Sequence, residues 1–288
     1  MKPITKIVTI LLIATLFALT LSTLTACQQT KDPNKLYVGM ECGYAPFNYT
    51  QKDDKNGAVK ISNANGYANG YDVMIAKKIA QALGKELVIV KYEWDALVNG
   101  VTTGALDFII AGMSPTADRL ESIDFSTAYY ESQLVIVVRK DGKFANATKL
   151  ADFGGAKIVA QLGTFHDKAL QEQCQAHNIL RQTPMETFPA MINALNTKAI
   201  DGYIAEEPGA IADCAANSAF TYIRLVNNST GFIASAEDVQ IAIGIQKNSP
   251  VTAQVNAALA TITQAEREQM MQLAIELSVA DYSLRTLQ

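Results

Sequence analysis

The stretch from residue 111 to residue 119 concentrates side chains that suit the binding of an anion. It contains Gly112, the hydroxyls of Ser114 and Thr116, and the guanidinium of Arg119, directly after an apolar segment. Free backbone N–H groups at the start of a helix attract anions, and a guanidinium can hold both oxygens of a carboxylate. The stretch therefore predicts a grip on a small carboxylate. The alternative is an ordinary strand–turn–helix whose arginine is solvated.

The elements before this stretch must carry it to the edge of a sheet. Residues 41–48 are read as a loop rich in aromatic side chains, and residues 51–67 as a polar hairpin or surface excursion. The remaining segments predict a β-α-β-α-β run with the anion-binding stretch at the carboxyl edge of a largely parallel sheet, where ligands of open α/β sheets bind. The expected strands are 36–40, 86–92 and 108–111, and the expected helices are 73–84 and 94–103.

A second α/β run follows, again with polar turns at strand exits. One such turn spans residues 161–165 and another spans residues 206–208, where Pro208 suits the first turn of a helix. Two runs of this kind predict two α/β lobes with a ligand cleft between them that closes by hinge motion. The expected strands are 131–139, 157–160, 202–205, 222–225 and 241–245, and the expected helices are 165–176, 187–196 and 208–217, with one or two closing helices over 250–278.

The N-terminus resembles a secretory signal of the bacterial lipoprotein type. Two lysines precede an apolar segment that ends at Leu24, and Leu24, Ala26 and Cys27 match a lipobox. We expect residues 1–26 to be removed, Cys27 to carry a lipid, and residues 27–35 to form a polar tether. The alternative is a membrane-spanning anchor, for which the apolar segment is borderline in length.

Composition and charge limit the classes of function. The 288 residues suffice for one large or two medium domains. Without residues 1–26 the chain holds 22 basic and 28 acidic side chains, a net charge of −6, which makes it a poor nucleic-acid binder. The two histidines have no zinc-ligand spacing, and no Gly-rich phosphate loop is present, so we expect no metal and no cofactor. Cys174 and Cys214 either form a disulfide or remain thiols.

Six short motifs follow one another along the chain. They are Tyr44-Ala45-Pro46-Phe47, Gly70-Tyr71-Asp72-Val73, Trp94-Asp95-Ala96-Leu97, Gly112-Met113-Ser114-Pro115-Thr116 with Arg119, Gln161-Leu162-Gly163-Thr164, and Asp201-Gly202-Tyr203 followed by Glu206. Each is weakly specific alone. In this order, behind a lipobox, they resemble the extracytoplasmic solute-binding proteins that supply amino acids to ATP-driven (ABC) importers, in the polar amino-acid branch.

The resemblance implies a periplasmic-binding-protein-like α/β fold. In that fold the first lobe is discontinuous, and two crossing strands join it to the second lobe; here the crossings would lie near Ser132 and residues 228–236. Lobe 1 would then comprise residues 36–132 and 234–288, and lobe 2 residues 133–233.

The resemblance also assigns roles in holding a ligand carboxylate. The position of Arg119 pairs with the α-carboxylate, and that of Ser114 donates to the same group. Backbone N–H groups at Gly112 and around Thr164 and Phe165 would complete the cage.

The position of Glu206 would accept the α-ammonium of the ligand. Family members usually have Asp there, and Glu has the same charge with one more methylene. A buried zwitterion needs a fixed opposite charge at each end, and Arg119 and Glu206 would supply these from opposite lobes. Glu207 remains an alternative acceptor, and whether His166 faces the pocket stays open.

Three further positions concern the ligand side chain. Tyr44 and Trp94 match positions whose rings sandwich the ligand, although Trp94 could equally be core. Glu41 matches an acid found where basic ligands are preferred, although it could be a solvated loop residue. The candidate ligand-binding residues are therefore Glu41, Tyr44, Trp94, Ala111, Gly112, Met113, Ser114, Arg119, Thr164, Phe165 and Glu206.

These expectations favour a non-enzymatic receptor. It would be a monomer anchored by lipid on Cys27 outside the cytoplasm, and it would deliver a polar amino acid, in the first place a basic one (Arg, Lys or His), to an ABC permease. One alternative is an enzyme similar to cyclohexadienyl dehydratases, with a cleft acid as proton donor. Others are glutamine or another polar amino acid as the ligand, or the ligand-binding part of a sensor.

Overall fold

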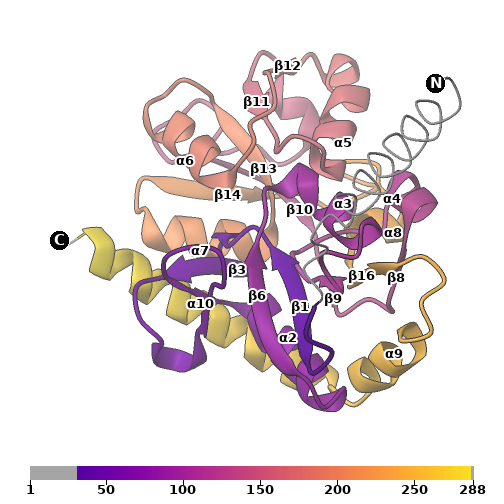
Figure 1. Cartoon of the computed structure of the whole chain (residues 1–288). Coiled ribbons are helices and arrows are strands. Elements are labelled where there is room, and N and C mark those ends of the chain that lie inside the picture. Colours follow the sequence, from indigo (N-terminus) through magenta and orange to yellow (C-terminus); the bar gives the residue numbers. More distant parts are fainter. Residues whose placement is uncertain (1–30, 287–288) are drawn as a thin grey trace, which may run out of the picture. The chain divides into compact units, whose positions relative to one another are not determined.

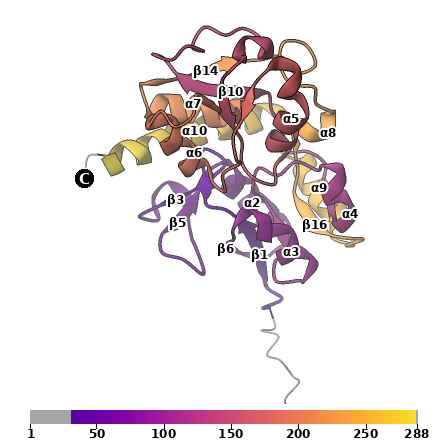
Figure 2. The same ribbon diagram turned by 90° about the horizontal axis from the view of Figure 1, so that it is seen from above.

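The computed structural model describes residues 31–286, and we describe the unit that begins at Asn34. The predicted signal peptide and residues 27–30 of the predicted tether, Cys27 among them, lie outside the described residues. The described strands form two five-stranded sheets, a four-stranded sheet and a two-stranded pair, with helices around them (Figures 1 and 2). Within residues 31–286, no helix combines the length and the apolar character needed to cross a membrane.

The first five-stranded sheet contains the three strands of the predicted β-α-β-α-β run, one short strand that was not predicted, and one strand from far along the chain. Its order is β6-β1-β7-β16-β8, in which β6, β1 and β7 are parallel and β16 is antiparallel to both neighbours. The carboxyl ends of β1 and β7 therefore lead into the loops that carry Glu41 and Gly112. The strands are β1 (Lys35–Met40), β6 (Glu86–Lys91), β7 (Phe108–Ile109), β8 (Ile123–Phe125) and β16 (Gly244–Gln246), and the connecting helices are α2 (Tyr71–Ala82), η2 (Trp94–Ala96), α3 (Leu97–Thr102) and α4 (Ala117–Ser122).

The second five-stranded sheet has the order β12-β11-β13-β10-β14. Its strand β10 is buried on both faces: Val135 and Val137 belong to the core shared with the first sheet, and Leu134, Ile136 and Val138 belong to a separate core. Burial on both faces explains the unbroken apolar run in the sequence. The elements are β10 (Leu134–Arg139), η3 (Leu150–Phe153), β11 (Lys157–Val159), α5 (Phe165–Gln173), η4 (Gln175–His177), β12 (Leu180–Arg181), α6 (Phe188–Asn196), β13 (Gly202–Glu206), α7 (Glu207–Ala216) and β14 (Phe220–Arg224).

A small antiparallel sheet occupies the region that we predicted as a loop followed by a polar hairpin or surface excursion. Its order is β2-β3-β5-β4, so the chain doubles back on itself beside the end of β1. The first of its strands carries Tyr44 toward the second sheet. The elements are β2 (Gly43–Tyr44), β3 (Asn48–Gln51), η1 (Lys55–Gly57), β4 (Val59–Lys60) and β5 (Tyr67–Asn69).

Two segments join the five-stranded sheets. Strand β9 (Tyr130–Glu131), close to the predicted crossing at Ser132, pairs antiparallel with β15 (Gln240–Ile241). Strand β15 follows the short helix α8 (Ala236–Val239), so this pairing lies after the residues 228–236 at which we predicted the second crossing. The strand expected at 241–245 is divided between β15 and β16, and the lobe boundaries remain a prediction.

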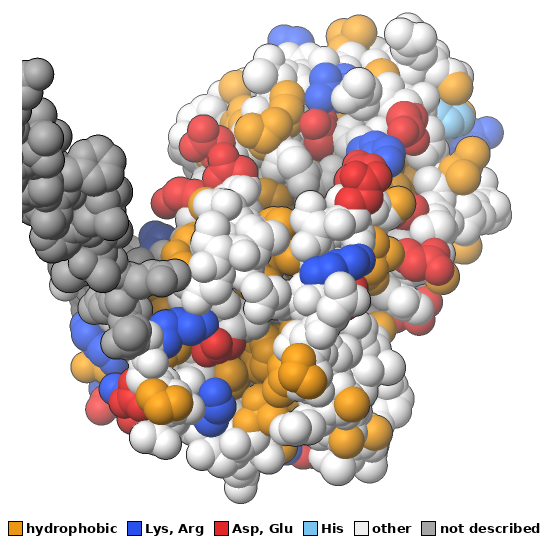
Figure 3. All heavy atoms as spheres, turned by 45° about the vertical axis from the view of Figure 1, so that its right-hand side comes forward, with side chains coloured by type: hydrophobic (Ala, Val, Ile, Leu, Met, Phe, Trp, Pro, Cys, Tyr) orange, Lys and Arg blue, Asp and Glu red, His pale blue; other side chains and the backbone are white. Residues whose placement is uncertain are grey.

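Two helices close the described chain, α9 (Thr252–Ala260) and α10 (Gln264–Thr286). Helix α10 packs against α2 beside the first sheet and against α7 beside the second (Figures 1 and 2). On the face drawn in Figure 3, positive and negative side chains are interspersed, so this face offers no broad surface of one sign.

Candidate functional site

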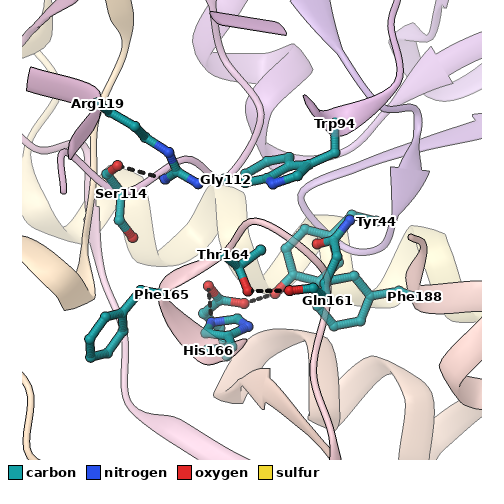
Figure 4. A pocket seen from close by; sticks show the side chains of 11 residues that line it. Tyr44, Trp94, Gly112, Ser114, Arg119, Gln161, Thr164, Phe165, His166 and Phe188 are labelled. Atoms are coloured by element: carbon teal, nitrogen blue, oxygen red, sulfur yellow. Dashed lines mark hydrogen bonds and ion pairs between the residues drawn. The ribbon is translucent and has the colours of Figure 1, made fainter. Parts of the chain in front are cut away.

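A pocket lies where loops at the ends of the two five-stranded sheets meet (Figure 4). In the close-up, Arg119 and Trp94 lie on one side of it, and Phe165, His166 and Phe188 lie on the other. Most of the lining side chains stand at strand exits or helix starts, where backbone groups and polar side chains are free to face a ligand. The pocket is lined by Tyr44, Trp94, Gly112, Ser114, Arg119, Gln161, Thr164, Phe165, His166, Phe188 and Glu206.

Arg119 connects the two sides of the pocket. It lies in α4 and donates through Nη1 to the carbonyl oxygen of Ser114 (2.8 Å) and through Nη2 to that of Gly163 (3.0 Å). Its guanidinium carbon lies 5.1 Å from the ring centroid of Trp94, whose Nε1 donates to the same Gly163 oxygen at 3.3 Å. Burial lowers the pKa of Arg119 to about 10, which leaves it charged at neutral pH. The guanidinium of Arg119 is therefore held against Gly163, in the loop that follows β11.

Glu206 forms the acidic end of the pocket. It ends β13, is buried, and accepts a hydrogen bond from the hydroxyl of Tyr44, which comes from the other side of the pocket. Its Oε1 lies 2.9 Å from Nε2 of His166. Burial raises the pKa of Glu206 to about 8 and lowers that of His166 to about 3. At neutral pH a protonated Glu206 carboxyl thus donates to a neutral imidazole, and Arg119 carries the charge of the pocket.

The other ring nitrogen of His166, Nδ1, is buried and has no hydrogen-bond partner among the described residues. An unpartnered buried polar atom costs free energy, on the order of 1–3 kcal/mol, unless a ligand or water satisfies it. Because His166 lines the pocket, it offers a polar group to a bound molecule.

Glu41 is buried but is separated from the pocket by Gln161. The Nε2 of Gln161 lies 3.1 Å from each carboxyl oxygen of Glu41 and also donates to the carbonyl oxygen of Glu186 (2.9 Å). Burial raises the pKa of Glu41 to about 7. The side chain is therefore not the solvated loop acid that we considered as an alternative, and Gln161 is the residue that faces the pocket.

The predicted site residues fall into two groups. Ala111 and Met113 are buried beside the pocket without lining it, as is Glu41. The N–H of Gly112, expected to face a carboxylate, instead donates to the hydroxyl of Tyr129 at 3.4 Å. The predicted residues that do line the pocket are Tyr44, Trp94, Gly112, Ser114, Arg119, Thr164, Phe165 and Glu206.

Three lining residues were not among the candidates. Gln161 stands in the motif at the exit of β11, so its position was a usable signal, and His166 had been left open two residues after Thr164. Phe188 stacks on Tyr44 with ring centroids 4.0 Å apart. Nothing in the local sequence indicated this contact.

Two open alternatives concern Glu207 and the cysteines. Glu207 does not line the pocket; its carboxylate accepts from the hydroxyl of Tyr222 (3.5 Å) and from Nη2 of Arg224 (3.0 Å). Cys174 and Cys214 are free thiols in the structure. Across residues 31–286, no group of three or more His, Cys, Asp or Glu side chains is arranged to hold a metal ion.

Two α/β lobes, joined by two segments and enclosing a pocket with a cation on one side and an acid on the other, define a periplasmic-binding-protein fold. The chain belongs to the bacterial extracellular solute-binding proteins, family 3, whose family model matches residues 36–272.

Comparisons with individual proteins agree with this assignment. The arginine-binding extracellular protein ArtP of Bacillus subtilis is 26% identical over 82% of this chain and 86% of its own length. A probable histidine-binding protein of Campylobacter jejuni is 30% identical over 68% of this chain and 77% of its own length. A crystal structure of an amino acid ABC transporter substrate-binding protein from Streptococcus pneumoniae, bound to L-arginine, superposes with a TM-score of 0.73 at 25% identity, covering 87% of this chain and 96% of that one.

Proposed function

We propose that this protein is a receptor that captures a free basic amino acid, arginine first among them, and delivers it to an ABC importer. The observation that carries the proposal is that Arg119 and Glu206 both line one pocket. The two ends of an amino acid carry opposite charges, and each needs a fixed partner once water is excluded. Arg119 would hold the α-carboxylate, and Glu206 would hold the α-ammonium.

The same pairing couples binding to closure. Arg119 lies in α4 beside the first sheet, and Glu206 ends β13 of the second. A ligand held by both makes its full set of contacts only when these two sides of the pocket approach each other. Only such a difference in contacts shifts a conformational equilibrium. The closed, loaded form is then what a permease recognises.

The preference for a basic side chain rests on Glu41 and Gln161 together. A guanidinium that enters this end of the pocket replaces the Gln161 Nε2 as donor to the two Glu41 oxygens, and Glu41 ionises. Trp94 and Tyr44 line the same pocket, and their ring faces can stack on the cationic side chain of the ligand. Relatives named for binding arginine or histidine support a ligand of this class.

Calorimetric titration of the protein, unfolded and refolded to remove bound ligand, with the common amino acids tests the proposal. Arginine is expected to bind most tightly, followed by lysine and histidine, with glutamine weaker. If no amino acid gives a measurable heat of binding, the receptor function is contradicted. Turnover of arogenate or prephenate under the same conditions would instead favour the dehydratase alternative.

Replacing Glu41 with glutamine is expected to weaken arginine binding by about tenfold or more and glutamine binding by no more than about twofold. The neutral amide leaves the buried guanidinium without an opposite charge. Glu93→Gln is the matched control, because Glu93 is a nearby but exposed acid. Equal losses for both ligands in Glu41→Gln would remove Glu41 from the selection of the side chain.

Affinity is expected to rise with pH from about 6 to about 8 and then to level off. Burial raises the pKa of the unliganded Glu206 to about 8, so below that pH the carboxyl must lose a proton before it can accept an ammonium. The bound ammonium lowers this pKa, so binding releases a proton and is favoured as pH rises. Calorimetry in buffers of different ionisation enthalpy measures the protons released, which for arginine come from Glu206 and Glu41 together and for glutamine from Glu206. A glutamine affinity independent of pH would count against the assignment of Glu206.

For the cellular setting, we propose removal of residues 1–26, a lipid on Cys27 and a monomeric receptor outside the cytoplasm. The lipobox residues and the family's extracellular character support this. Cells fed an alkyne fatty acid are expected to label the wild-type protein but not Cys27→Ala, which should be released from the membrane fraction. Label retained by the Cys27→Ala protein would contradict the anchor.

A further inference from the structure

Asp72 is a fully buried carboxylate that does not line the pocket. It lies in the first turn of α2, is 0% exposed, and forms no ion pair with any described residue. Burial raises the pKa of Asp72 to about 6, while hydrogen bonds from Tyr129, Asn48 and the backbone N–H of Gly112 oppose that rise, so the group is ionised at neutral pH. A buried charge that has no cation as partner lowers stability unless its hydrogen bonds compensate. The hydrogen bonds of Asp72 lead to two loops of the pocket.

One of these hydrogen bonds leads to the loop after β7. The hydroxyl of Tyr129 donates to Oδ1 of Asp72 at 2.7 Å, and the same hydroxyl accepts from the N–H of Gly112 at 3.4 Å. Gly112 lines the pocket, has a φ of +64°, and would place a Cβ atom 3.3 Å from the ring of Tyr44. The orientation of this peptide, next to Ser114, is thus fixed from behind by Tyr129 and Asp72.

The other hydrogen bond leads to the loop after β1. The Nδ2 of Asn48 donates to Oδ2 of Asp72 at 2.8 Å, and its Oδ1 accepts from the N–H of Cys42 at 2.8 Å. Cys42 has a φ of +56° and lies between Glu41 and Tyr44. Two of the loops through which the first sheet reaches the pocket, those after β1 and β7, are therefore held by one carboxylate.

We propose that Asp72 is a positioning residue for the ligand site, fixing the Gly112 loop through Tyr129 and the Cys42 loop through Asn48, and so setting ligand affinity without touching the ligand. The inference rests on the proposed amino-acid receptor function. In the Asn48 relay the N–H of Cys42 fixes which way the amide points, so its Nδ2 must donate to Asp72. The hydroxyl of Tyr129 accepts from Gly112, and Asp72 supplies the acceptor for its own proton. Asp72 consequently faces two donors and must accept from both.

Asparagine at position 72 cannot do this. Its amide has one acceptor end and one donor end. With the oxygen toward Tyr129, its N–H meets the Nδ2 donor of Asn48; with the oxygen toward Asn48, the hydroxyl proton of Tyr129 loses its acceptor. Turning Asn48 to relieve the conflict would set its amide against the N–H of Cys42. Asp72→Asn is therefore expected to weaken arginine binding by about tenfold or more.

The double variant Asp72→Asn/Asn48→Asp provides the rescue. Its amide at position 72 can donate to the new carboxylate at position 48, which still accepts from the N–H of Cys42, and its Oδ1 still accepts from Tyr129. Each of these hydrogen bonds is restored, and the negative charge moves from position 72 to position 48. We therefore expect affinity to return to within about threefold of wild type. Asn48→Asp alone places two carboxylates next to each other, so its affinity for arginine should be lower than that of the double variant.

Tyr129→Phe tests the Gly112 relay without removing a charge. The matched control is Tyr203→Phe, because the Tyr203 hydroxyl donates to Asp213 at 2.6 Å in a similar pair that does not line the pocket. Both variants should lose similar stability, but only Tyr129→Phe should lose affinity. The loss should be larger for arginine than for argininamide, which lacks the α-carboxylate that this loop faces.

Each result has a distinct meaning. If the wild-type protein binds no amino acid, the receptor function fails and the role of Asp72 in it fails with it. If wild type binds arginine, and folded Asp72→Asn and Tyr129→Phe bind it equally well, only the positioning role is wrong. Equal losses for arginine and argininamide, or a loss in Tyr203→Phe as large as in Tyr129→Phe, would show a general effect of stability and would also overturn the inference.

Discussion

Replacing Arg119 with alanine is expected to abolish amino-acid binding while the protein stays folded. Loss of one partner from a buried, hydrogen-bonded charge pair costs about 2–5 kcal/mol or more, which corresponds to a loss of affinity of about thirtyfold to several thousandfold. The fold should persist because Arg119 lies in the short helix α4 and its hydrogen bonds are to two carbonyl oxygens, of Ser114 and Gly163. Calorimetric titration with arginine, together with the thermal midpoint, measures both effects.

Two variants complete this experiment. Arg119→Lys keeps the charge without the planar fork and should recover part of the affinity. Arg224→Ala removes an exposed arginine whose partner is Glu207 and should bind like wild type. Near-wild-type affinity in Arg119→Ala would refute the carboxylate site.

Replacing Glu206 with glutamine is expected to reduce affinity by about a hundredfold or more without destabilising the unliganded protein. At neutral pH the buried carboxyl is protonated, because its pKa is raised to about 8. An amide of the same shape can still accept from the hydroxyl of Tyr44 and donate to Nε2 of His166. It cannot ionise, so the bound ammonium loses its counter-charge.

The neighbouring acid provides the control for Glu206. Glu207→Gln changes the next residue in the chain, but that side chain interacts with Tyr222 and Arg224 and does not line the pocket. We expect its affinity to stay within about twofold of wild type. If Glu207→Gln lost binding and Glu206→Gln did not, the ammonium site would have to be reassigned.

Local pattern was sufficient for most of the elements around the site. The alternation before Met40, the helical spacing after Asp72 and the apolar run at Val135–Val138 each correspond to an element in the structure. These signals reflect periodicity within a few residues, which backbone geometry imposes directly. The single strand expected at 241–245 is divided in the structure, because two short strands that belong to different sheets share one apolar stretch.

The sequence by itself determined which groups are available for binding: a guanidinium after β7 and an acid at the end of β13, in an order typical of one family. It also determined their placement at strand exits, because a parallel strand delivers its carboxyl end to a predictable edge. Arg119, Ser114, Thr164 and Glu206 all line the pocket for this reason.

Only the tertiary structure decided which neighbours these groups have. Gln161 covers Glu41 although 120 residues separate them, and Asp72 and Tyr129 are 57 residues apart. Such contacts depend on how whole sheets and loops pack, and no local periodicity encodes them. The same packing removes water from Glu206 and His166, so their protonation at neutral pH is a property of the fold and not of the residue types.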